Sequence, residues 1–107
     1  LEPGYEQKMF TTEEKRGQLR LIASPDGREG SVTVHQDLNL YATVLGNGEA
    51  IQHSVGSDRH LWVQVVRGSV VVNGETLEQG DAAAIAAEET LEIVGKDDAE
   101  VLVFDLA

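Results

Sequence analysis

The sequence alternates apolar and polar residues with a period of two, in short runs that turn-forming residues separate. In the clearest run, from Leu38 to Val44, every second residue is apolar. This alternation predicts a strand, because successive side chains of a strand point to opposite sides. The strand period recurs over most of the chain, so the whole chain is predicted to be all-β.

Turn signals bound these runs. Asn73-Gly74, between two β-favouring segments, predicts a hairpin, and Ser24–Gly27 predicts a second reversal. About eight to ten short strands at regular intervals favour a sandwich or barrel over a parallel α/β sheet. The main predicted strands are Leu19–Ile22, Val32–His35, Leu38–Val44, Glu49–Val55, Leu61–Arg67, Ser69–Val72, Ala82–Ala86, Leu91–Val94 and Val101–Leu106.

The N-terminal residues 1–17 lack this period and are predicted to be an arm or linker. Thr11 and Glu14 have capping-box spacing, which predicts one or two helical turns over Thr12–Arg16. Residues 18–107 are then expected to form one domain. The chain begins with Leu1, so we expect a fragment, a processed chain or a piece cut between domains.

Charge and residue types exclude several classes of function. The net charge of −11 disfavours binding to nucleic acid and to anionic membranes, because both are anionic. No run approaches the ~20 apolar residues that span a bilayer, and residues 1–15 contain no signal peptide. The chain has no cysteine, which excludes disulfides and thiolate metal sites and fits a cytoplasmic protein.

Two sets of segments resemble a known family. Gly68 to Ile85, with its hairpin at Asn73-Gly74 and its corner at Gly80-Asp81, resembles the middle of a cupin. Glycine suits the sharp reversals of a small jelly roll. The second set resembles the C-terminal domain of pirin-like two-cupin proteins of the quercetin 2,3-dioxygenase type, in the family's order. Its segments are Pro3–Gln7, Ser24–Arg28, Val34–Asp37, Leu40-Tyr41, Arg59–Gly68 and Val103–Leu106.

The resemblance implies a cupin-type jelly roll, or double-stranded β-helix, over residues 18–107. It also implies a parent protein that opens a flavonol with O₂ at a divalent transition metal held in an N-terminal cupin. The C-terminal cupin would support that catalytic domain and would not itself be catalytic. Its expected partners are the N-terminal cupin or a second copy, and the parent's substrate is expected to be a flavonoid.

The metal-ligand pattern of a catalytic cupin is eroded in this chain. Such a cupin offers His-x-His, a glutamate and a later histidine, which suit a transition metal. The glutamate position falls near Leu61, and Ala82–Ala87, after the Gly80-Asp81 corner, contains no histidine. We therefore predict no catalytic, cofactor-binding or metal-binding residue in this domain.

A self-contained metal-binding cupin enzyme is the alternative. In it, His53 and His60 would converge on one ion, with Asp58 or Glu49 as a further ligand. We favour local hydrogen bonding for both histidines. A selective metal site generally needs three or more protein ligands, together with residues that hydrogen-bond to those ligands and orient them. A third hypothesis is a protein-interaction module that acts through the acidic surface.

Several other polar and aromatic residues have either a structural or a functional interpretation. We expect His35 to face solvent or a domain contact. Trp62 and Tyr41 are more often packed in a core or interface than stacked on a ligand. Arg59 and Arg67 are expected to pair with nearby acidic residues, with a modest gain in stability.

The last predicted strand is apolar on both faces. Val101 and Val103 lie on one side, and Leu102, Phe104 and Leu106 lie on the other. Burial on both sides has two explanations. Either the strand runs through the middle of the sandwich, or its second face contacts a missing domain or a second copy.

Overall fold

The computed structural model describes residues 15–87 and 89–107. These residues form ten strands and one short 3₁₀ turn, η1 (Arg28–Gly30), which confirms the all-β prediction. The predicted helix over Thr12–Arg16 lies mostly outside the described residues, and Arg16 itself bridges to Val44. The strands are β1 (Arg20–Ser24), β2 (Val32–Thr33), β3 (Leu38–Leu45), β4 (Ala50–Ser54), β5 (His60–Arg67), β6 (Ser69–Val72), β7 (Glu75–Glu78), β8 (Ala82–Ile85), β9 (Thr90–Gly95) and β10 (Ala99–Leu106).

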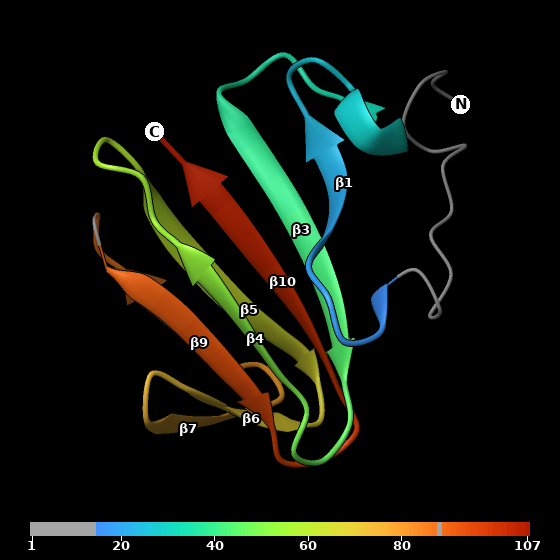
Figure 1. Ribbon diagram of the computed structural model, residues 1–107, viewed down its shortest axis with the longest axis vertical. Helices are drawn as coiled ribbons and strands as arrows, with labels where there is room; N and C mark the ends of the chain where they lie inside the picture. Colours follow the sequence, from blue (N-terminus) through green and yellow to red (C-terminus); the bar gives the residue numbers. More distant parts are fainter. Residues whose placement is uncertain (1–14, 88) are drawn as a thin grey trace.

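The strands form two sheets. One has six strands in the order β2-β1-β3-β10-β5-β8, and the other has four in the order β4-β9-β6-β7. Strand β10 runs between β3 and β5 and is antiparallel to both (Figure 1). β10 is therefore a central strand of its sheet, with Val101 and Val103 in the core, whereas Leu102, Phe104 and Leu106 on its other face are only partly buried.

The core consists of aliphatic side chains on the inner faces of both sheets. Fully burying one such side chain stabilises a fold by about 1.5–3 kcal/mol. The largest fully buried members of this cluster are Leu45, Leu61, Val63, Val65, Val70, Leu91, Ile93, Val101 and Val103.

Strand β3 presents its more polar face to this core. Its partners across the ladder show the direction, because Thr43 pairs with Val101 and Tyr41 with Val103, and both valines are core residues. The apolar alternate residues, such as Leu38 and Leu40, consequently face outward. Thr43 is fully buried, and its hydroxyl donates to the carbonyl of Lys15 at 3.4 Å.

The predicted hairpin at Asn73-Gly74 is confirmed. Both residues have positive φ, 47° and 87°, as a two-residue hairpin turn requires. Asn73 also extends the ladder towards β9, because its backbone N–H donates to Glu92 O at 2.9 Å. The Glu92 N–H in turn donates to Asn73 Oδ1 at 2.7 Å.

Gly68 is the corner at which the chain leaves one sheet and enters the other, between β5 and β6. Its φ of 75° lies in the left-handed region. A Cβ at this position would collide with the backbone of Asp98 and would lie 2.8 Å from Ala99 Cα. Only glycine fits this corner without a shift of the chain.

Within the described residues, no helix has both the length and the apolar character needed to cross a bilayer.

Candidate functional site

The residues near two of the expected cupin ligand positions, Leu61 and the segment after Gly80-Asp81, are apolar. Leu61 on β5 is fully buried in the core. Its ladder partner on β8 is Ile85, which is also buried. Neither side chain can coordinate a metal ion, so this part of the barrel is filled by packing.

The histidines proposed as alternative ligands lie on opposite sides of the six-stranded sheet. The His53 ring lies on the inner side of β4, with its centroid 5.4 Å from that of Tyr41. His60 is exposed on the outer side of β5, where its ladder partner is Leu106. Because a sheet separates them, the two imidazoles do not converge on one ion.

The carboxylates offered as further ligands also lie apart. Asp58 is exposed in the loop before β5 and accepts a hydrogen bond from Ser57 Oγ at 3.1 Å. Glu49 precedes β4 and accepts from Gly46 N at 2.7 Å, about 13 Å along the strand from His53. Across residues 15–87 and 89–107, no three His, Asp or Glu side chains are grouped to hold a metal ion.

A cluster of charged residues ties three chain segments together at one end of the sandwich. Arg59 Nε donates to Asp105 Oδ1 at 2.8 Å, and a second guanidinium nitrogen donates to Asp37 Oδ1 at 2.7 Å. These two carboxylates raise the pKa of Arg59. The cluster joins the loops before β3 and β5 to the end of β10. It confirms that Arg59 pairs with acidic residues, although both partners are distant from it along the chain.

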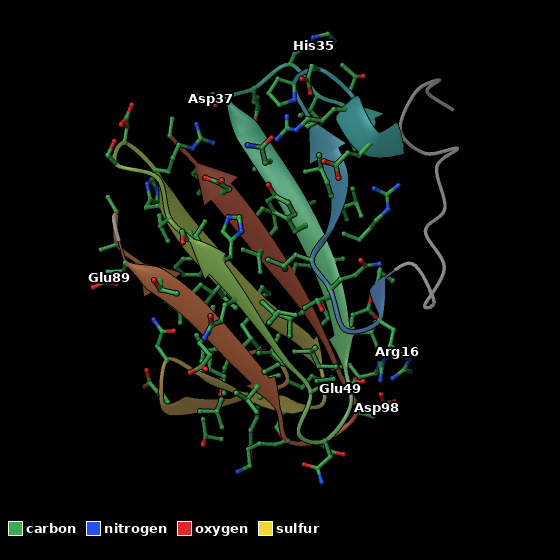
Figure 2. The ribbon with its side chains drawn as sticks, in the orientation of Figure 1. Arg16, His35, Asp37, Glu49, Glu89 and Asp98 are labelled. Atoms are coloured by element: carbon green, nitrogen blue, oxygen red, sulfur yellow. The ribbon has the colours of Figure 1, made fainter. Side chains whose placement is uncertain are left out.

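A second ionic cluster lies at the other end of the molecule. Arg67 donates to Asp98 Oδ2 at 2.8 Å and lies 3.8 Å from Glu100. Figure 2 shows Asp98, Glu49 and Arg16 together at the end opposite to His35 and Asp37. Both clusters are built from paired charges, so neither offers an unsatisfied cation to an anionic ligand.

Tyr41 links the first cluster to the core. The side chain packs against the hydrophobic cluster, and burial, followed by the nearby Asp105 carboxylate, raises the pKa of its hydroxyl. Arg28 opposes this shift, and it is held in place by Asp26 and Asn39 at 3.0 and 3.1 Å. The prediction of core or interface packing for Tyr41 is confirmed.

We expect Tyr41 to ionise at a higher pH in the folded chain than in the unfolded chain. Because the folded pKa is raised above 10.0, the associated stability is complete below about pH 10 and is lost as the pH rises through the folded pKa. Titration of the tyrosinate absorbance should show a late transition that Tyr41→Phe removes. A single transition at the ordinary pKa, unchanged in the variant, would contradict this assignment.

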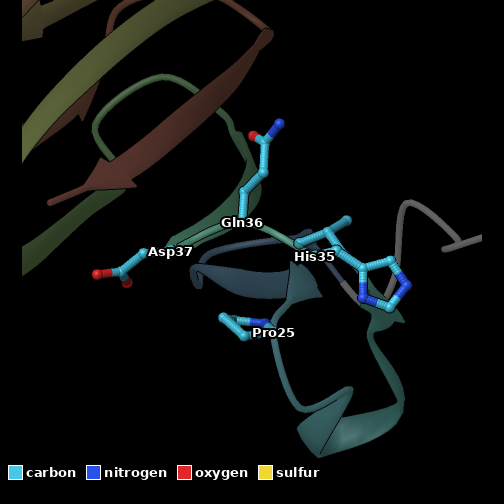
Figure 3. Close-up of a pocket in the computed structure, with 5 residues that line it drawn as sticks. Pro25, His35, Gln36 and Asp37 are labelled. Carbon is cyan, nitrogen blue, oxygen red and sulfur yellow. The ribbon is translucent and has the colours of Figure 1, made fainter.

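The structure also has an open depression, lined by Pro25, Val34, His35, Gln36 and Asp37. His35 is exposed, as expected. Figure 3 shows the side chains of His35 and Asp37 pointing in opposite directions. The depression therefore does not bring polar groups together in the way that a binding site for a small ligand requires.

Trp62 lies on the outer side of β5 and is 44% exposed. Of the two predicted roles, packing in the core is therefore wrong for Trp62, and packing in an interface stays a prediction. The ladder partner of Trp62, Phe104 on β10, pairs in turn with Leu40 on β3, which makes one apolar row across three strands. The sequence showed the apolar alternate face of β10, but it did not show that Trp62 lies beside that face.

The comparisons with known proteins agree with this architecture. The family model described as the quercetinase C-terminal cupin domain matches residues 21–106. Quercetin 2,3-dioxygenase of Escherichia coli strain K12 is 40% identical over 104 residues, which are 97% of this chain and 44% of the relative. The chain thus spans less than half the length of this relative.

Solved structures give the same result. The crystal structure of YhhW from Escherichia coli matches with a TM-score of 0.85 at 38% identity, over 94% of this chain and 42% of that chain. The crystal structure of bacterial pirin YhhW in complex with nickel(II), also from Escherichia coli, has a TM-score of 0.79 at 42% identity, over 83% and 39% of the two chains. The predicted cupin jelly roll is confirmed.

Proposed function

This chain belongs to the quercetinase C-terminal cupin family, and from that premise we propose that it is a non-catalytic companion domain of a two-cupin protein. In this proposal the N-terminal cupin of the parent protein holds a divalent transition metal and opens a flavonol ring with O₂. The domain described here supports that cupin and contributes no metal ligand.

The observation that carries the proposal is the apolar packing near the expected glutamate position. Leu61, near which that position falls, is fully buried, and the segment after Gly80-Asp81 has no histidine. A transition-metal centre needs several nitrogen or oxygen donors around an open position. His53 and His60 point to opposite sides of a sheet and do not replace that donor set.

The identity of the parent reaction rests on relatives that are about twice as long. One of them is named quercetin 2,3-dioxygenase, and another was crystallised in complex with nickel(II). These properties support a metal-dependent flavonol dioxygenase as the parent protein. A cytoplasmic location for the parent remains a prediction from the absence of cysteine.

The metal content of the purified chain tests this proposal. We expect well below one metal ion per chain after exposure to Fe, Mn, Ni, Cu or Zn and desalting, as measured by elemental mass spectrometry. We also expect no ring cleavage when a flavonol is added.

A double variant, His53→Ala with His60→Ala, provides the comparison. One tightly held ion per chain that this variant loses would overturn the proposal and would indicate a self-contained metal enzyme. Equal background binding of metal by the double variant and by the unaltered chain would agree with the proposal.

A further inference from the structure

We propose that the outer face of the six-stranded sheet is the surface against which the N-terminal cupin of the parent packs. We call this surface the outer apolar face. This inference rests on the proposed companion role and assigns it to particular residues. The outer apolar face consists of Leu38, Leu40, Trp62, Val66, Ala84, Leu102, Phe104 and Leu106.

The ladder register aligns these side chains in rows across four strands. The central row runs from Ala84 on β8 through Trp62 and Phe104 to Leu40. The next row pairs Leu38 with Leu106. Paired residues of adjacent strands project to the same side of a sheet, so the rows share one face. Two polar residues, Gln64 beside Leu102 and His60 beside Leu106, lie on the same face.

Two large apolar side chains of this surface are exposed. Trp62 is 44% exposed and Val66 is 43% exposed, while Phe104 and Leu40 are half-buried. Apolar side chains exposed close to one another are a feature of contact surfaces. Tryptophan and phenylalanine are also enriched in the buried centres of protein interfaces.

The charge distribution favours burial of the same face. Glu100, the acidic residue on the outer side of β10, is neutralised by Lys15 at 2.6 Å and lies 3.8 Å from Arg67. The opposite sheet carries acidic side chains such as Glu78 and Glu92, both exposed. Burying an unpaired carboxylate is costly, so the six-stranded sheet is the better contact surface in a chain of net charge −11.

The edge strand β8 continues this surface without a charged barrier. Its residues Ala82 to Ile85 carry no charge, whereas exposed edge strands are commonly protected by charged side chains or proline. An edge of this kind suits a strand that a partner domain covers.

The length of the relatives indicates which domain covers the outer apolar face. This chain matches a C-terminal cupin model and accounts for 44% of the Escherichia coli quercetin 2,3-dioxygenase. In that relative, more than half of the chain lies outside the matching segment and is covalently attached to it, and the parent protein of this proposal has the same arrangement. Attachment gives a high effective concentration, which favours the attached N-terminal half over a second copy.

The test uses a fusion of the N-terminal half of the Escherichia coli quercetin 2,3-dioxygenase to this chain. Hydroxyl-radical footprinting with peptide mass spectrometry measures the oxidation of Trp62 and Phe104 in the fusion and in the free chain. We expect about fivefold or greater protection of both residues in the fusion, because interface centres exclude water. Unchanged oxidation of both residues would overturn the inference.

Two matched variants of the fusion localise the contact. Trp62→Glu should return Phe104 to the oxidation rate of the free chain, whereas Thr76→Glu, an exposed position on the opposite sheet, should keep the protection. Protection in the free chain that depends on its concentration would overturn the inference in favour of a second copy. Metal content tests the companion role separately, so either proposal can fail alone.

Discussion

A Leu61→Glu variant is expected to lose most of its native stability. The change places a carboxylate at a fully buried core position, next to Asp105 in the ladder. Burying an unpaired charge and deleting a core leucine should lower the free energy of unfolding by more than about 4 kcal/mol. Domains of this size are stable by only about 5–15 kcal/mol, so urea denaturation followed by circular dichroism should show a very low midpoint.

The adjacent residue provides the control. Trp62→Glu introduces the same side chain one residue later, on the exposed side of the sheet, and should lower the free energy of unfolding by only about 1 kcal/mol. Restoration of Leu61→Glu to full stability by added nickel would contradict our interpretation, because it would require further metal ligands around that position. Equal losses in the two variants would contradict the two-faced arrangement of β5.

Gly68→Ala should have the second large effect. A Cβ would meet the backbone of Asp98 and Ala99, which cannot rotate away as a flexible side chain can. The φ of 75° adds conformational strain for any other residue. We expect a loss of about 3 kcal/mol or more in the free energy of unfolding.

Gly74→Ala separates the two causes. Gly74 has a similar φ of 87°, but no atom lies within 4 Å of its added Cβ. It should cost about 1 kcal/mol, from backbone strain alone. Equal losses in the two variants, measured by urea denaturation, would show that crowding at the corner between the sheets is unimportant.

Much of the fold could be predicted because strand signals are local. Alternation and turn chemistry identified most strands, and Asn73-Gly74 identified its hairpin. The face of β3 that enters the core could not be predicted from those patterns. Leu38 and Leu40 look like core residues in the sequence, yet β10 turns them outward and turns Tyr41 and Thr43 inward.

Some features of the candidate site could likewise be read from the sequence, and others needed the tertiary structure. The apolar residues at Leu61 and after Gly80-Asp81 can be read directly from the sequence, whereas the absence of a metal from this domain stays a prediction. The cluster of Arg59, Asp37 and Asp105 could not be predicted, since its members lie far apart along the chain. Nothing in their local sequence distinguishes them from other surface charges.

The sequence by itself determined the all-β class, the position of the turns and the chemistry missing from the ligand positions, because each depends on neighbouring residues. Only the tertiary structure decided which side of each strand is buried and which residues meet. The apolar alternate face of β10 is the clearest case. Leu102 and Phe104 are apolar in any fold, but only the pairing of β10 with β3 and β5 makes them part of one outer face.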